Sequence, residues 1–442
     1  MPSRRAVLLA AISVSSLAMA ALAAAPVRPK TGSAKPDVDW PSFRGPARTG
    51  VSTDTGLLQS WPEEGPPLAW ETQGAGRGYA SLAIAGGRIF TLGDAPSTAQ
   101  DEDEYLLAFD QKTGRSLWKL KTGPAWTSGS PSWQSSRSTP TVDGQMIYAL
   151  TAHGDLVCAF AANGKEKWRR NLTSDFGGKK GDGWGYSESV LIDGKQVVCT
   201  PGGETATMVA LNKLTGDPIW KSVRAGDRGA GHSSIVPSQV GKTRIYVQTT
   251  ASGALGVRAT DGKLMWSYEI DRTTAVIPTP IVRDNLVFFA AGYGRGGALL
   301  KQVADRAGNV TVEEVYPINK DLANKHGGIV LVGDYLFGDS DDRGIPFCAD
   351  LMTGEIKWKS RGAGRDSASV AAADGHLYIH FANGKMVLAK AAPDAYEEVG
   401  AFTVPGSGER PSWSHPVILG GKLYLREQDR LLCYDLRAGA SR

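Results

Sequence analysis

A short phrase recurs along nearly the whole chain and constrains the fold more than any other feature. It centres on Asp-x-x-Thr-Gly-x-x-x-Trp, and its clearest copy runs from Leu107 to Trp118. In each copy the Trp follows a Gly by four residues. The other copies, some of them degenerate, end at Trp168, Trp220, Trp266 and Trp358. Self-similarity of this kind is typical of a repeat architecture.

The spacing within the phrase predicts a hairpin. Gly114 can adopt backbone conformations that other residues resist, so Thr113-Gly114 fits a tight connection between two antiparallel strands. Asp110 can accept hydrogen bonds from the backbone of that turn. Trp118 then lies on the second strand, where its indole offers a large apolar surface to a neighbouring unit.

A second pattern precedes the first: a Gly, a polar residue, then an aliphatic and an aromatic residue. A further strand is expected before several of these aromatic or aliphatic anchors, as at Ser138-Thr139-Pro140. Each period therefore holds about four short strands and almost no helical periodicity. The pattern predicts an all-β fold, an eight-bladed β-propeller of four-stranded antiparallel blades. The eight anchors are Phe90, Tyr148, Val198, Tyr246, Phe288, Phe337, Tyr378 and Tyr424.

The two ends of the repeat array complement each other. The last unit stops near Leu431–Asp435 without a Trp, and the segment around Trp70 carries a Trp strand with no unit before it. We expect this N-terminal strand to complete the last blade and close the ring. The fifth and seventh units lack the Trp and keep Tyr316 and Phe402 nearby. The predicted docking residues are Trp70, Trp118, Trp168, Trp220, Trp266 and Trp358.

Three segments are expected along the 442 residues: a signal peptide (1–23), a linker and lead segment (24–66), and the propeller (67–442). Arg4-Arg5, an apolar stretch and small residues give the first segment the pattern of a cleaved secretory signal. A membrane anchor is the less favoured interpretation. Because the first Cys is Cys158, we expect no lipoprotein, and place the mature chain in the periplasm or outside the cell, by either the Sec or the twin-arginine route.

Charge and cysteine content argue against a nucleic-acid-binding protein and against a disulfide-bonded one. The chain has 49 basic and 45 acidic residues and no Lys/Arg-rich run, so no nucleic-acid partner is predicted. Cys158, Cys348 and Cys433 each fall six residues before the turn Gly of their unit, where other units carry Ala. Together with Cys199 in an apolar strand, they are interpreted as small buried residues rather than disulfide partners.

The repeated phrase resembles the tryptophan-docking repeat of pyrroloquinoline-quinone (PQQ) propellers, and the resemblance covers residues 40–437. That family includes quinoprotein alcohol dehydrogenases, which bind PQQ and calcium in the ring. It also includes BamB, the non-catalytic scaffold of the outer-membrane β-barrel assembly machine. The lead Trp40-Pro41-Ser42-Phe43-Arg44-Gly45-Pro46 is similar to the start of many exported PQQ-like propellers. The resemblance implies the fold more strongly than an activity, because the repeat is a packing device.

The residues that carry the chemistry of the quinoprotein dehydrogenases have no counterparts at matching motifs in this sequence. Those enzymes usually stack the quinone against two adjacent cysteines, and no two cysteines are adjacent here. Their calcium ligands and catalytic Asp match no motif. Asp339-Ser340-Asp341-Asp342 offers oxygen ligands but lacks a supporting Gly and distal Glu, so a solvated turn is the favoured interpretation and no metal site is assigned. Ser187 and Ser189 lack a Gly-x-Ser-x-Gly context, so no nucleophile elbow is predicted.

A ligand site is expected where the inner strands of a propeller converge on the central channel. Counting back from the Gly of each unit gives a ring of inner-strand starts that also includes Ser187, Ile277 and Ala368. The residues predicted to bind a ligand at the channel mouth are Tyr79, Arg137, Trp184, Tyr186, His232, His326 and Trp413. For each of them a local packing or hydrogen-bonding role is the alternative.

We therefore expect an exported, monomeric, non-catalytic binding scaffold, BamB-like in architecture, that holds a protein or small ligand at the channel mouth or on one face. No catalytic residue and no cofactor is assigned. The alternatives are a PQQ- and calcium-dependent quinoprotein oxidoreductase and a binder of cell-envelope polysaccharide. The sequence does not name the ligand, the partner or the face that binds it.

Overall fold

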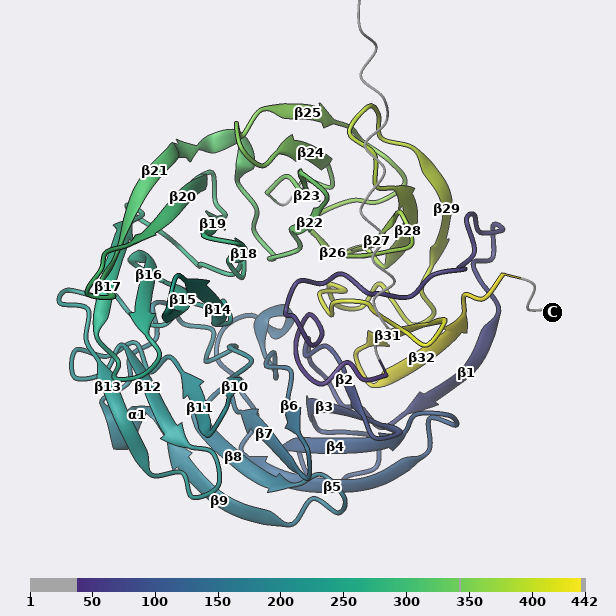
Figure 1. The fold of residues 1–442 in the computed structure, drawn as a ribbon. Helices are drawn as coiled ribbons and strands as arrows, with labels where there is room; N and C mark the ends of the chain where they lie inside the picture. Colours follow the sequence, from purple (N-terminus) through teal and green to yellow (C-terminus); the bar gives the residue numbers. More distant parts are fainter. Residues whose placement is uncertain (1–37, 342, 439–442) are drawn as a thin grey trace, which may run out of the picture. The chain divides into compact units, whose positions relative to one another are not determined.

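A computed structural model describes residues 38–341 and 343–438. Their strands form eight four-stranded antiparallel sheets, or blades, which follow one another around a ring (Figure 1). The predicted all-β, eight-bladed propeller is thereby confirmed. The predicted signal peptide (1–23) and residues 24–37 of the predicted linker and lead segment lie outside the described residues.

Each blade begins at the channel and ends at the rim (Figure 1). Blades 1 to 4 contain β2 (Ala83–Ala85), β3 (Arg88–Asp94), β4 (Glu104–Asp110) and β5 (Ser116–Gly123); β6 (Thr141–Asp143), β7 (Met146–Leu150), β8 (Asp155–Phe160) and β9 (Glu166–Asn171); β10 (Leu191–Asp193), β11 (Gln196–Cys199), β12 (Met208–Asn212) and β13 (Pro218–Ser222); and β14 (Val236–Val240), β15 (Thr243–Thr250), β16 (Gly253–Arg258) and β17 (Leu264–Glu269).

The second half of the ring follows the same order. Blades 5 to 8 contain β18 (Ile281–Arg283), β19 (Leu286–Ala291), β20 (Gly296–Ala304) and β21 (Val310–Asn319); β22 (Val330–Val332), β23 (Tyr335–Asp339), β24 (Pro346–Asp350) and β25 (Ile356–Lys359); β26 (Ala368–Ala373), β27 (His376–Phe381), β28 (Lys385–Lys390) and β29 (Glu398–Thr403); and β30 (Val417–Leu419), β31 (Lys422–Glu427), β32 (Arg430–Asp435) and β1 (Leu68–Gln73).

Helices contribute little to this fold. In residues 38–341 and 343–438 the helical elements are one α-helical turn, α1 (Leu172–Phe176), and two 3₁₀ turns, η1 (Pro131–Trp133) and η2 (Lys320–Leu322). Among the described residues, no helix has the length and apolar character needed to cross a membrane.

The repeated phrase forms the outer hairpin of each blade that carries it. In blade 1, Asp110 Oδ1 accepts hydrogen bonds from the N–H groups of Lys112 (3.1 Å) and Thr113 (2.9 Å). Gly114 follows with φ +71°, a conformation that favours glycine, and a Cβ at this position would lie 2.7 Å from the indole of Trp70. The glycine therefore serves the turn and also leaves room for an indole from the neighbouring blade.

The same contact recurs around the ring. Trp118, Trp168 and Trp220 lie against Gly164, Gly216 and Gly262 of the next blade, and the indole N–H groups of these three donate to backbone carbonyls there. In blade 5 the ring of Tyr316 lies against Gly354 and takes the place of the missing Trp. An aromatic ring, buried in the case of Trp220 and partly buried in the others, thus lies between successive sheets.

The four cysteines are buried and unbonded. Cys158, Cys348 and Cys433 pair directly across the sheet from Trp168, Trp358 and Trp70, at the position that Ala108 and Ala210 occupy opposite their own tryptophans. A small side chain is needed there because the cross-strand indole covers the position.

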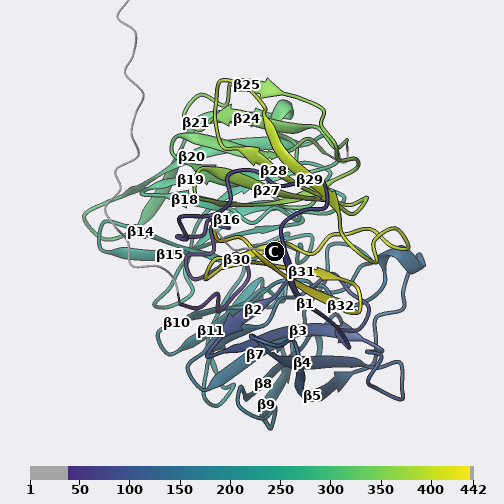
Figure 2. The same cartoon turned by 90° about the vertical axis from the view of Figure 1, so that its right-hand side faces the viewer.

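The strand β1 belongs to the last blade although it comes first in the chain. It pairs antiparallel with β32, with Trp70 opposite Cys433 and Gln73 opposite Arg430. Figure 2 shows the two strands side by side. Blade 8 therefore contains residues from both ends of the described chain.

The lead segment crosses one face of the ring. Trp40 bridges to Ile84 in blade 1, and Val51 bridges to Ala372 in blade 7. Two buried arginines hold it: Arg44 donates to Gly327 O (3.0 Å) in blade 6, and Arg48 donates to Val190 O (3.2 Å) in blade 3. Burial lowers the pKa of each guanidinium to about 10. The lead segment therefore contacts blades 1, 3, 6 and 7.

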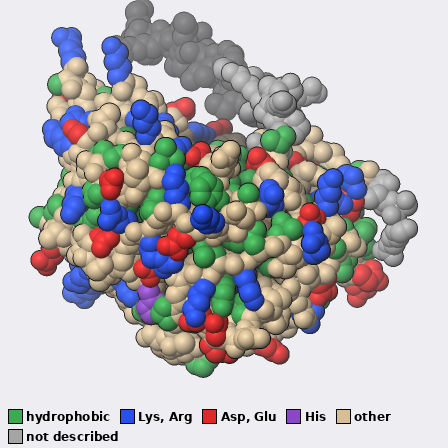
Figure 3. Space-filling view, turned by 90° about the horizontal axis from the view of Figure 1, so that it is seen from below, with side chains coloured by type: hydrophobic (Ala, Val, Ile, Leu, Met, Phe, Trp, Pro, Cys, Tyr) green, Lys and Arg blue, Asp and Glu red, His purple; other side chains and the backbone are tan. Residues whose placement is uncertain are grey.

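Charged side chains of both signs are interspersed over the face shown in Figure 3. This mixture agrees with the near balance of 49 basic and 45 acidic residues in the sequence. A surface of this kind produces no extended field of one sign.

Candidate functional site

A cavity of about 420 Å³ lies at the central channel, where the loops that precede the inner strands meet. Six of the seven predicted ligand-binding residues line it: Tyr79, Arg137, Trp184, His232, His326 and Trp413. Phe43 from the lead segment also contributes to the wall, so the segment that crosses the ring helps to shape the cavity. The volume falls in the range of small-molecule sites.

The seventh predicted residue, Tyr186, is not among the residues that line the cavity. Its side chain is buried between blades 2 and 3, and its hydroxyl donates to Pro201 O (3.0 Å). Successive side chains of an extended segment point to opposite sides, so Ser187 faces the cavity while Tyr186 packs into the core.

The predicted position on inner strands also needs correction. The lining residues precede those strands, as Tyr79 and His232 lie four residues before β2 and β14 begin. Ala368 does begin a strand, β26, but it is not among the residues that line the cavity. Placement on loops frees the side chains from the sheet and lets them turn into the channel.

A chain of hydrogen bonds holds these loops in register. The N–H of Ser81 donates to Thr139 Oγ1 (3.0 Å), and the N–H of Thr139 donates to Ser189 Oγ (3.0 Å). The chain continues to Ser234 (3.0 Å) and Thr279 (3.2 Å) in blades 4 and 5. Each loop is thus fixed to the next by a hydroxyl two residues after a channel-facing position.

Aromatic rings form one wall of the cavity. The centroid of the Trp413 ring lies 4.5 Å from that of His326, in a stacked arrangement, and 4.7 Å from that of Tyr79. Trp184 meets Trp133 edge to face at 5.9 Å. Flat faces of this kind bind planar or sugar rings by stacking.

Arg137 is a partly buried cation of the site. Its Nη1 donates to Trp184 O (2.9 Å), its Nη2 donates to Trp133 O, and the guanidinium lies 5.6 Å from the Tyr79 ring. Burial lowers the pKa of Arg137 to about 10, so it stays charged at neutral pH. Lys325 lines the same cavity, and the lining drawn from the described residues includes no Asp or Glu side chain.

His232 makes two side-chain contacts. Ser187 Oγ lies 2.6 Å from Nδ1, and Asp182 Oδ2 lies 2.8 Å from Nε2. Burial acts to raise the pKa of Asp182, but the charge and hydrogen bond of His232 and the N–H of Trp184 hold it below its usual value. Sequence reasoning missed Asp182, because no spacing motif links these three residues.

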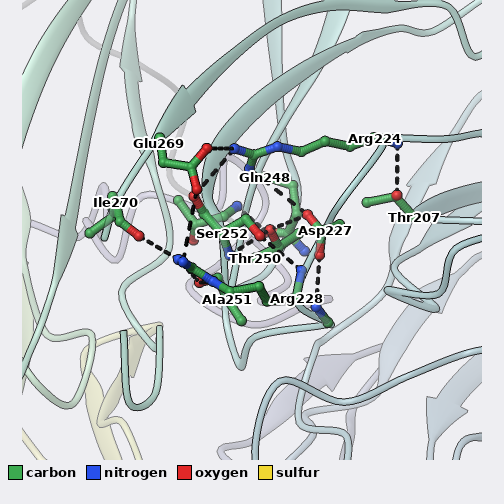
Figure 4. A network of polar contacts seen from close by, with 12 residues as sticks. Thr207, Arg224, Asp227, Arg228, Gln248, Thr250, Ala251, Ser252, Glu269 and Ile270 are labelled. Atoms are coloured by element: carbon green, nitrogen blue, oxygen red, sulfur yellow. Dashed lines mark hydrogen bonds and ion pairs between the residues drawn. The ribbon is translucent and has the colours of Figure 1, made fainter. Parts of the chain in front are cut away.

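The loop that ends at His232 is firmly braced (Figure 4). Arg224 Nη2 donates to Glu269 Oε2 (3.4 Å), and Arg228 Nη2 donates to Ile270 O (2.5 Å). Both acceptors lie at the end of β17, so two arginines tie this loop to blade 4. The segment that leads to His232 is therefore held against blade 4.

Next to the site, Ser136 joins two buried carboxyl groups. Its Oγ lies 2.5 Å from Asp94 Oδ1 and 2.8 Å from Glu104 Oε2. Burial, together with the negative charge of Asp94, raises the pKa of Glu104 to about 8. Glu104 is therefore protonated in the folded chain at neutral pH.

This shift predicts a pH dependence of stability. Between the ordinary Glu pKa of about 4.5 and the folded value of about 8, the folded chain holds a proton that the unfolded chain has released. The contribution of Glu104 is thus fully present below pH 4.5 and is lost as pH rises to 8, by up to about 1.4 kcal/mol per pH unit. We expect the free energy of unfolding, measured with denaturant, to fall between pH 5 and 8, and Glu104→Gln to make this fall smaller. The exposed Glu313→Gln should leave it unchanged, and equal slopes in all three chains would contradict the assignment.

No cluster of acidic, imidazole or thiol metal ligands is present among the described residues. Within 38–341 and 343–438, no three His, Cys, Asp or Glu side chains come together in a way that could hold a metal ion. Nor do the buried thiols supply an adjacent pair for stacking a quinone. Asp339 and Asp341 lie in the described part of the chain, and Asp342 lies outside it.

The fold and the repeat define a PQQ-like repeat β-propeller with a cavity at its channel. A family model described as outer membrane protein assembly factor BamB matches residues 41–182 and 103–360. The chain belongs to this family.

Individual relatives are distant. The chain is 25% identical over 228 residues to outer membrane protein assembly factor BamB of Bordetella pertussis strain Tohama I, covering 43% of this chain and 53% of the relative. It is 22% identical over 289 residues to tetrathionate hydrolase of Acidithiobacillus ferrooxidans, covering 62% and 49%. These matches span about half the length of each curated relative.

Solved structures agree on the fold. The crystal structure of quinohemoprotein alcohol dehydrogenase from Comamonas testosteroni superposes with a TM-score of 0.61 at 13% identity, covering 92% of this chain and 81% of that one. At this identity the likeness concerns the fold alone.

Proposed function

We propose that this protein is an exported binding scaffold of the cell envelope whose central cavity takes a small, ring-bearing anion. The observation that carries the proposal is the cavity itself, in which Arg137 and Lys325 accompany Trp413, Tyr79 and Trp184. A cation in the cavity wall favours a negative charge, and the aromatic faces favour a ring. Uronic acids and aromatic carboxylates combine both features.

Binding can be followed through the tryptophans of the cavity. We expect a uronic-acid disaccharide or an aromatic carboxylate to change the intrinsic fluorescence, and a neutral disaccharide to bind at least about tenfold more weakly. Arg137→Gln should weaken binding of the anion by about 10- to 100-fold, since a charge-assisted hydrogen bond contributes about 1.5–3 kcal/mol. The matched control is Arg258→Gln, which removes a partly exposed arginine that lies outside the cavity and pairs with Asp261. Equal affinity for neutral and anionic rings would contradict the proposal.

Membership of the BamB family supports a protein partner as well. We propose that a face of the ring holds that partner while the cavity remains a separate site. Co-purification from envelope extract with barrel-assembly components would support this part.

The oxidoreductase alternative is tested with the same ligands as the cavity. PQQ is added with and without Ca²⁺, and quinone binding with dye-linked alcohol oxidation would favour that alternative.

A further inference from the structure

The contacts of His232 form a relay that ends in the cavity. Ser187 Oγ lies 2.6 Å from Nδ1, and Nε2 lies 2.8 Å from Asp182 Oδ2. Ser187 and His232 both line the cavity wall, and the side chains of His232 and Asp182 are almost fully buried. A hydroxyl, an imidazole and a carboxylate are therefore joined in series at a site that a small molecule can reach.

The loops that carry the relay are joined backbone to backbone. Ala230 O accepts from the N–H of Gly181 (2.8 Å), and the N–H of Ala230 donates to Lys179 O (2.8 Å). A Cβ at Gly229, which has φ +129°, would lie 2.5 Å from the N of Gly181. Glycine at this position lets the loop of Asp182 approach the loop of His232.

The acid of the relay is fixed on both oxygens. Asp182 Oδ1 accepts from the N–H of Trp184 (3.0 Å), while Oδ2 faces His232. A carboxylate held at Nε2 favours the tautomer that carries its proton there, which leaves Nδ1 to accept a proton from Ser187. The two ring nitrogens exchange the roles they have in the chymotrypsin-type triad, but the sequence of acid, imidazole and hydroxyl is the same.

We propose that Ser187 is a nucleophile activated by His232 and Asp182, and that the cavity hydrolyses carboxylic esters of small, ring-bearing acids. The substrate class rests on the proposed function, because the same aromatic and cationic wall would hold the acyl part. Arg137 and Lys325 line the cavity and provide positive charge that favours the oxyanion of a tetrahedral intermediate.

The chemistry balances with water as the only co-reactant. Ser187 Oγ forms a bond to the carbonyl carbon as its proton passes to His232 Nδ1. The bond from that carbon to the ester oxygen then breaks, and the alcohol leaves with the proton from His232. Water adds to the acyl-serine by the same route and gives the free acid and the original hydroxyl.

A fluorophosphonate probe tests the nucleophile directly, since an activated serine displaces fluoride and forms a bond to phosphorus. We expect intact-mass analysis of the folded chain to show one addition, and peptide mapping to place it on Ser187. Ser187→Ala should abolish labelling, and Asp182→Asn should slow hydrolysis of a p-nitrophenyl benzoate by about 10²–10⁴-fold. The exposed Ser267→Ala, on β17, is the matched control and should label like the parent chain.

The outcomes separate this inference from the binding proposal. If the parent chain binds an aromatic carboxylate by fluorescence but is not labelled, or is labelled at another residue, the nucleophile assignment is wrong and the binding proposal stands. Labelling of Ser187 without carboxylate binding would support the nucleophile and contradict the anion site. Because mapping is done on the parent chain, the result does not depend on whether a variant folds.

Discussion

Replacing Trp220 by Ala is expected to lower the free energy of unfolding by about 3–5 kcal/mol. The indole of Trp220 is 7% exposed, donates to Ala259 O (3.1 Å), and lies 2.5 Å from the position of a Cβ on Gly262. Its removal leaves an interblade cavity that the two sheets cannot fill without moving. The effect should appear as a lower midpoint in guanidinium unfolding.

A second tryptophan provides the control. Trp133 is 45% exposed and lies outside the interblade contacts, so Trp133→Ala should change the midpoint little. Equal losses for the two variants would mean that the indole between blades 3 and 4 does not stabilise the ring in the way described.

Replacing Arg426 by Ala is expected to cost a similar amount, about 3–5 kcal/mol, for a different reason. Arg426 lies in β31, is 1% exposed, and donates to acceptors in β3 of blade 1 and in the segment that leads from β1 to β2. These acceptors are Ala75 O, Gly76 O, Ala80 O, Thr91 Oγ1 and Leu92 O. Without the guanidinium, they stay buried with a donor missing.

The conservative variant sharpens this test. Arg426→Lys keeps the charge, but an ammonium group has three donors and no planar fork, so we expect it to recover less than half of the loss. Arg430→Ala removes an exposed arginine of the same blade that pairs with Glu71, and should cost less than about 1 kcal/mol. Full recovery by Lys would show that charge rather than hydrogen-bond geometry matters at this position.

Much of the fold could be predicted because the repeat is local. Asp110, Thr113 and Gly114 specify a hairpin within a few residues, and counting their copies gives the number of blades. Most of the channel-mouth residues could be predicted for the same reason, since each holds one fixed place relative to its own inner strand. The position of Tyr186 could not be predicted in this way, because counting residues does not show which side of an extended loop faces the channel.

Other features depend on contacts between distant parts of the chain. Asp182 and His232 lie 50 residues apart and meet only because adjacent blades bring their loops together. Arg48 reaches Val190 across 142 residues, and no local pattern marks either arginine of the lead segment as buried. The relay could not be found from a Gly-x-Ser-x-Gly motif, because the loops around Ser187 place it without a strand-to-helix turn.

The pairing of β1 with β32 has a consequence for how the chain is made. β1 leaves the ribosome before any other strand of the ring, and its partner is complete only when Asp435 has emerged. β1 is therefore synthesised first but can pair with its partner strand only at the end of synthesis. Until then its hydrogen-bonding edge is unpaired. Glu71 and Gln73 give that edge a polar character, which discourages premature association with other nascent chains.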